Sequence, residues 1–402
     1  MDKHLRLNLG GYALAWSLVI GMLTAGYLNL VNWLIDRVWL DGRHLFDLPS
    51  HWYPFLICIP AGLLIGYLNK RLGDYPLTIA GVLTQVRMKG AVDYHQWWKS
   101  MLLGLLVLSA GGSIGPEAST TVIIGGMVNW LGDRMRWAYY LDQTRDDEHR
   151  PSIWRDKMRR EELAQAPRFG TLFKDRRQKR LVITLLILVG VVGSAIIFKL
   201  FPEEGVFGIH HRTINWQWLD LLTALPALAV GIAFGWLFVQ LGKWTSHIEH
   251  ARLDKVWQGG LFGLLLAAST LISQDALFSG EFRIVPFSRE ALGMTAGYLL
   301  LVAVLKAVVT NLGFALCWRG GTIFPAIFAS LAIGVACALV LPGTVAVNAA
   351  VVLTASLTCI LGRPLLTVIL LALLVPIELL PVLLVAAYAT DWLMKKTKLM
   401  QK

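Results

Sequence analysis

The sequence predicts an all-α polytopic membrane protein, because three of its properties agree on that fold class. Of its 402 residues, 56% are hydrophobic and 16% are charged, whereas soluble domains carry roughly a quarter charged residues. The mean hydropathy is +0.58. Apolar runs such as 12–34, 181–198 and 222–241 approach or reach the ~20 residues that cross a bilayer as a helix. Backbone groups in lipid need internal partners, so these runs favour helices, and the alternating pattern of a membrane β-barrel is absent.

The basic start Met1–Arg6 precedes an apolar stretch that is too long for a signal peptide and has no clear small-residue cleavage site. We therefore expect a retained first helix. Gly111–Pro116 interrupts one later segment, and Pro376 and Pro381 interrupt the last. The predicted membrane segments are 11–35, 53–69, 100–134, 180–200, 217–242, 256–274, 292–316, 322–341, 346–360 and 363–392.

The net charge of +11 is concentrated in one loop. Between Arg134 and Arg180 there are 14 Lys and Arg against 8 Asp and Glu, and further lysines lie near residue 402. Beside membrane helices the positive-inside rule explains such charge more simply than nucleic-acid binding does. We therefore expect this loop and both termini in the cytoplasm, with the protein in the cell (inner) membrane. The mixed-charge stretch 139–180 predicts a partly helical cytoplasmic insertion, interpreted as a solvated connector rather than a regulatory or docking element.

The four cysteines form no Cys-x-x-Cys pair and lie in or beside apolar runs, which is typical of small buried hydrophobic residues. No metal site and no cofactor is expected. The cysteines are Cys58, Cys317, Cys337 and Cys359.

Two similar Gly-rich breaks stand in the two halves of the chain. Gly111–Pro116 (GGSIGP) and Gly320–Pro325 (GGTIFP) match at four of six positions, and each lies between apolar helices. Paired interruptions of this kind indicate an internal duplication and a transport site. A helix that begins inside a membrane directs unpaired N–H groups and a positive dipole end at an anion. Glycine permits close approach, and proline at the first helical position has no N–H to lose.

Glu117 follows the first break and is the one ionisable residue between Lys99 and Asp133. An acidic residue inside a membrane segment indicates function by default. Its carboxylate would compete with an anion for the same helix N-terminus and would leave when protonated, so we expect a gate. The structural alternative is a simple helix cap.

Two other functions fit the sequence less well. An intramembrane hydrolase would use Ser113 as nucleophile, but it needs a base, and none of the nine histidines lies well inside an apolar run. There is no His-Glu-x-x-His motif, and a structural or lipid-binding protein would leave Glu117 unexplained.

These motifs resemble those of the CLC chloride channel and transporter family. The segment Gly115-Pro116-Glu117 is similar to the family's Gly-Lys/Arg-Glu-Gly-Pro loop, and Gly320–Pro325 resembles its Gly-Gly-x-Phe-x-Pro loop. Lys306, 312–319 and Phe278-Ser279-Gly280-Glu281 also fit. The resemblance runs from Leu72 to the end, apart from 139–180, and implies an inverted-topology repeat with broken, re-entrant helices.

The resemblance implies a chloride channel or anion/proton antiporter that is a homodimer in the lipid membrane. Glu117 would be the gating glutamate, and Gly115, Pro116, Ala118, Ile323 and Phe324 would form the anion site. The single transport domain 1–402 would hold repeats at about 50–242 and 256–392, with no C-terminal regulatory domain.

The sequence departs from the family at the inner side of the path. Asp74 and Tyr75 stand where a Ser is expected, so they are candidate inner-gate residues, and the family's late Tyr has no match. This leaves chloride, fluoride and nitrate all open. Glu203 and Glu204 lie near the family's second glutamate and are candidates for a proton path.

Overall fold

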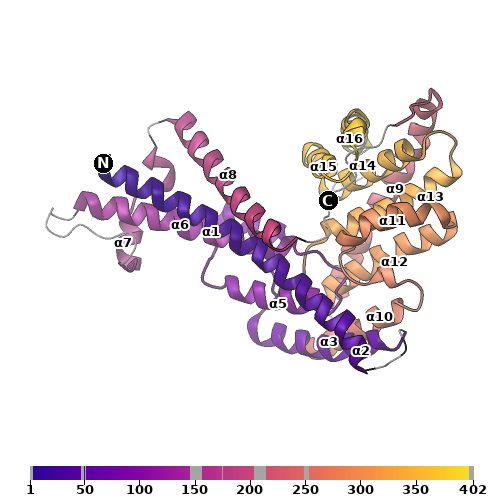
Figure 1. Cartoon of the computed structure of the whole chain (residues 1–402), viewed down its shortest axis with the longest axis horizontal. Coiled ribbons are helices and arrows are strands. Elements are labelled where there is room, and N and C mark those ends of the chain that lie inside the picture. The colour runs from indigo at the N-terminus through magenta and orange to yellow at the C-terminus, as the bar shows by residue number, and fades with distance from the viewer. Residues whose placement is uncertain are drawn as a thin grey trace. The chain divides into compact units, whose positions relative to one another are not determined.

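Helices make up nearly all of the computed structural model, which describes residues 3–46, 49, 51–144, 156–173, 175–202, 214–248 and 253–397 (Figure 1). Seven helical stretches within these ranges are long and apolar enough to cross a membrane. The α-helices are α1 (Lys3–Asp36), α2 (Gly42–Phe46), α3 (Tyr53–Leu72), α4 (Ile79–Lys89), α5 (Trp97–Ser109), α6 (Glu117–Thr144), α7 (Arg160–Gln165), α8 (Arg176–Leu200), α9 (Leu219–Ile248), α10 (Lys255–Ser269), α11 (Ile284–Glu290), α12 (Ala296–Ala315), α13 (Ile323–Val340), α14 (Val345–Leu361), α15 (Pro364–Ala372) and α16 (Leu380–Thr397).

The predicted membrane segments are confirmed as helices. The interruptions predicted at Gly111–Pro116 and at Pro376 occur, whereas the one predicted at Pro381 is wrong. The chain leaves helix between α5 and α6 at the first break, and between α15 and α16 around Pro376. The apolar-run prediction gave no segment for α2 or α11, because these helices are too short to register as apolar runs. Proline is tolerated at Pro381 because it is the second residue of α16.

The chain divides into two compact units that interleave along the sequence. Unit 1 comprises Met1–Trp33, Pro76–Leu102 and Ala118–Glu203, and unit 2 comprises Leu34–Tyr75, Leu103–Glu117 and Glu204–Lys402. Both Gly-rich breaks therefore belong to unit 2. The predicted repeats, at about 50–242 and 256–392, are not tested by this division and stay a prediction.

Unit 1 is built on the packing of α1 against α6 and α8. Apolar side chains of α1 and α6, including Tyr12 and Trp137, form its buried cluster. A Cβ at Gly193 of α8 would lie 2.3 Å from a backbone oxygen of α1, so glycine sets the close approach of these helices. Ser17 in α1 donates a hydrogen bond to the Leu186 carbonyl of α8 at 2.8 Å.

Part of the predicted insertion is helical and contacts α6, and most residues of 156–165 are exposed, so its interpretation as a solvated connector stays a prediction. The Arg136 guanidinium of α6 donates hydrogen bonds to the carbonyls of Leu163, Ala166 and Pro167 at the end of α7. The Trp137 indole N–H donates to the Glu162 carboxylate at 2.7 Å. Charged residues that look like loop in the sequence thus cap and anchor a short helix.

Unit 2 is held together by closely packed small residues and one large apolar core. A Cβ at Gly62 of α3 would lie 2.2 Å from the Gly259 oxygen of α10, so these helices touch backbone to backbone. The core combines buried side chains from α9 and from α11 through α16, among them Phe287, Phe328 and Leu383. This packing fixes α12 and α13, the helices that flank the second break.

Candidate functional site

The two Gly-rich breaks meet in unit 2. The Gly115 N–H donates to the Gly321 carbonyl at 2.7 Å, and the Gly321 N–H donates to the Gly115 carbonyl at 2.8 Å. This pair of bonds is an isolated antiparallel bridge. It joins segments more than 200 residues apart, and each leads directly into a helix, α6 or α13.

Glu117 reaches across this meeting point from the first residue of α6. Its Oε1 accepts a hydrogen bond from the Phe324 N–H of α13 at 2.8 Å. A Cβ on Gly115 would lie 1.9 Å from the Glu117 carboxylate, and one on Gly321 would lie 1.7 Å away. The carboxylate therefore fills a space that only glycine leaves open, at the helix N-terminus where an anion would bind.

The prolines of the breaks do not stand where the sequence analysis placed them. Pro116 immediately precedes α6, and Pro325 is the third residue of α13 rather than the first. Both positions are compatible with helix because the first turn has no internal acceptor for its N–H groups. Proline thus leaves the amides of Ile323 and Phe324 as the first N–H groups of α13.

Gly115 lies at the site, but its N–H is bound to Gly321. Gly115 therefore leaves space for the carboxylate but does not donate a hydrogen bond to it. Phe324 differs, because its N–H faces the carboxylate. Ala118 is the second residue of α6 and is 1% exposed. The assignment of Gly115, Pro116, Ala118, Ile323 and Phe324 to an anion site stays a prediction.

The candidate inner-gate residues lie just beyond α3. An Asp74 oxygen is 2.5 Å from Lys255 Nζ at the start of α10, and the other oxygen is 3.8 Å from Arg319. Arg319 directly precedes the second break. The Tyr75 N–H donates to the Gly73 carbonyl at 3.0 Å. Asp74 is thus in an ion-pair cluster rather than in the place of a neutral hydroxyl. Glu203 and Glu204 lie outside the described residues.

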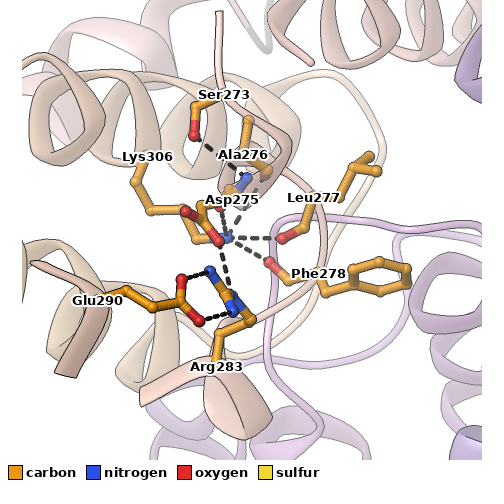
Figure 2. A network of polar contacts seen from close by, with 8 residues as sticks. All are labelled: Ser273, Asp275, Ala276, Leu277, Phe278, Arg283, Glu290 and Lys306. Atoms are coloured by element: carbon orange, nitrogen blue, oxygen red, sulfur yellow. Dashed lines mark hydrogen bonds and ion pairs between the residues drawn. The ribbon is translucent and has the colours of Figure 1, made fainter. Parts of the chain in front are cut away.

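Two residues of α12, Lys306 and Thr310, contact the first break or the turn beside it. The sequence alone assigned no role to either. Lys306 is fully buried and donates to backbone carbonyls of 275–278 (Figure 2). Thr310 and Ser113 hydroxyls are 3.1 Å apart. A lysine among apolar residues was the available signal. Ser113 has this hydroxyl as its partner, and no histidine approaches it among its described hydrogen bonds, which removes support for the hydrolase.

An ion-pair network beside the 275–278 turn stabilises the segment before α12 (Figure 2). Arg283 donates to Asp275 at 2.9 Å and to both oxygens of Glu290 at 2.8 and 3.0 Å. Hydrogen bonding to Arg283 lowers the pKa of the exposed Glu290 carboxyl. The pair therefore favours the charged form of both partners near neutral pH.

Comparisons with known proteins place the fold. Residues 175–395, more than half of the chain, match the family model described as voltage gated chloride channel. A search of curated proteins finds no match. The chain also resembles the crystal structure of a slow cyanobacterial Cl⁻/H⁺ antiporter, with a TM-score of 0.68, 17% identity and coverage of 98% of each chain.

Two further solved structures have the same fold. A CLC-type fluoride/proton antiporter has a TM-score of 0.65 at 15% identity, with 98% of this chain and 97% of that chain covered. A eukaryotic CLC transporter has a TM-score of 0.64 at 12% identity, with 98% of this chain and 73% of that chain covered. Together with the two breaks, these matches show that the chain belongs to the voltage-gated chloride channel family of anion transport proteins.

Proposed function

We propose that this protein exchanges a small anion for protons across the cell membrane, with Glu117 as the gate. The observation that carries the proposal is the hydrogen bond from the Phe324 N–H to the Glu117 carboxylate at 2.8 Å. A carboxylate that occupies the N-terminus of α13 mimics the anion that would displace it. Uncharged backbone donors suit conduction because they bind an anion without trapping it.

The sign of the pH dependence follows from this competition. The ionised carboxylate accepts the Phe324 N–H and excludes the anion, whereas the protonated form binds this donor weakly and can leave. Anion flux should therefore rise as the pH falls. Proton exchange, rather than channel conduction, is favoured because two structurally similar proteins are described as antiporters, and Glu117 can carry the proton itself.

The Glu117→Gln variant tests the gate. Its neutral amide cannot ionise, so we expect anion flux above that of the wild type at neutral pH, a flat pH profile and no coupled proton movement. The measurement is anion efflux from proteoliposomes with simultaneous pH recording, with chloride, fluoride and nitrate compared in turn. Wild-type flux and pH dependence retained in the variant would refute the gate. Proton-free efflux from the wild type would instead indicate a channel.

The proposal includes the protein's setting. We place both termini and the 139–180 insertion in the cytoplasm, following the distribution of Lys and Arg. A homodimer in which each subunit has its own path is proposed from the family resemblance. The transported anion, chloride or another small anion, is the substrate, and the site needs no cofactor for this exchange.

A further inference from the structure

Lys306 is a buried cation near the middle of a membrane helix, α12, and it lies outside the proposed anion site. It has no exposed surface. Its Nζ donates hydrogen bonds to the carbonyls of Asp275, Leu277 and Phe278 at 2.9, 2.9 and 2.6 Å (Figure 2). An ammonium group has three donors and no acceptor, so a cluster of carbonyls suits its charged form. These hydrogen bonds offset part of the free-energy cost of desolvating the ammonium group. A lysine held this way in a membrane segment indicates a function.

The 275–278 turn, whose carbonyls accept hydrogen bonds from Lys306, also contacts the first break. Phe278 ends this turn with φ at +57°, a left-handed conformation that an aromatic residue rarely adopts. Its N–H donates to the carbonyl of Gly111, the first residue of the break, at 2.9 Å. The lysine therefore stabilises a strained turn whose end supports the break.

A second side chain of α12 contacts the same break directly. Thr310 lies one helical turn after Lys306, on the same face, and its hydroxyl is 3.1 Å from that of Ser113. Thus α12 reaches the break at two places, at Gly111 through the 275–278 turn and at Ser113 by a hydroxyl pair. Glu117 follows four residues after Ser113.

We propose that Lys306 and Thr310 are positioning residues for the gate. By fixing the first break against α12, they set how far the Glu117 carboxylate reaches toward the Phe324 N–H. This inference rests on the proposed gating role of Glu117. Neither residue contacts the anion; each acts through the backbone of the break.

The Thr310→Val substitution separates this role from a direct electrostatic one, because it changes no charge. The Glu117 carboxylate lies against the backbone of Gly115 and Gly321 and accepts a hydrogen bond from the Phe324 N–H. Near Lys306, the carboxylates of Asp275 and Glu290 each pair with the Arg283 guanidinium (Figure 2). A shift that Lys306→Met and Thr310→Val share therefore reports the position of the break rather than the loss of a charge.

The test compares the pH profiles of anion efflux for Lys306→Met and Thr310→Val, each made in wild type and in Glu117→Gln. A displaced break weakens the hydrogen bond to the ionised Glu117, so the carboxyl protonates at higher pH. We expect half-maximal flux to move up by about one pH unit in Lys306→Met, and by less in Thr310→Val. In Glu117→Gln neither substitution should alter the pH profile.

A matched control is Thr354→Val on α14, because Thr354 is equally buried but its hydroxyl, among the described residues, donates to the Ala350 carbonyl of its own helix. If Glu117→Gln itself leaves the profile unchanged, the proposed function fails. If Glu117→Gln flattens the profile but both α12 variants behave like Thr354→Val, the positioning role fails. An equal loss of flux in both backgrounds, with no pH shift, also overturns it. Should Lys306→Met not fold, Thr310→Val alone decides.

Discussion

At the scale of single residues, the site depends on glycines, whose lack of a side chain leaves space for the Glu117 carboxylate. Gly321 has no left-handed φ, so its backbone would accept any residue. What excludes a side chain is space, since a Cβ there would lie 1.7 Å from Glu117 Oε2 and 2.9 Å from the Gly115 oxygen. When the carboxylate moves away, the same space would be open to an anion. We therefore expect Gly321 to be needed for anion passage as well as for the proposed gate.

The Gly321→Ala variant should lower anion flux by at least about tenfold at every pH, because the methyl group occupies the anion position and overpacking costs about 1–3 kcal/mol. The loss should persist in Glu117→Gln, where the gate no longer matters. Gly297→Ala is the matched control, since nothing lies within 4 Å of a Cβ at Gly297 on α12. Efflux from proteoliposomes measures both, and unchanged flux in Gly321→Ala would show that the anion passes elsewhere.

At the scale of elements, the breaks were predictable and their connection was not. Repeated Gly-Gly-x-Ile-x-Pro segments between apolar runs indicate helix ends in the membrane, and Glu117 stands out as a lone charge. The bridge between Gly115 and Gly321 depends on packing across more than 200 residues of sequence. Lys306 and Thr310 likewise gain their partners from the fold, because neither the 275–278 turn nor Ser113 is near α12 in the chain.

The attachment of the short helix α7 to α6 can be tested directly, and the sequence did not predict where this helix lies. Its end is capped by Arg136, whose guanidinium donates to three carbonyls. We expect Arg136→Ala to free α7 from α6, because hydrogen bonds to a charged group contribute about 1.5–3 kcal/mol. Faster amide hydrogen exchange over 160–173, with little change elsewhere, would report the release.

The control for this release is Arg159→Ala, which removes an exposed arginine just before α7 and should leave exchange unchanged. If Arg136→Ala also leaves the exchange of 160–173 unchanged, Arg136 does not anchor the helix. Exchange that rises throughout unit 1 would point instead to a general loss of packing, since Arg136 also pairs with Asp133 on α6 at 2.9 Å.

At the scale of the whole molecule, composition was enough for the fold class because the bilayer restricts a spanning chain so strongly. The division into two interleaved units was not visible in the sequence, since α1 and α6 each continue from one unit into the other without a change in composition.

The membrane topology follows from the distribution of charge and from the alternation of spans: α1 would leave the cytoplasm and α3 would return to it. Lys70 at the end of α3 pairs with Asp254 beside α10 at 2.5 Å, so α10 would start again from the cytoplasmic side.

This topology can be tested with single introduced cysteines, because three native cysteines are buried and Cys337 is only partly exposed. We expect Lys157→Cys in the insertion and Thr397→Cys after α16 to resist a membrane-impermeant thiol reagent in intact cells. Arg289→Cys, between α10 and α12, should react, and all three positions are exposed in the structure. The chain without introduced cysteines gives the background, and permeabilised cells should make all three reactive. Labelling of Lys157→Cys in intact cells would show that the insertion lies outside the cell and that the proposed orientation is wrong.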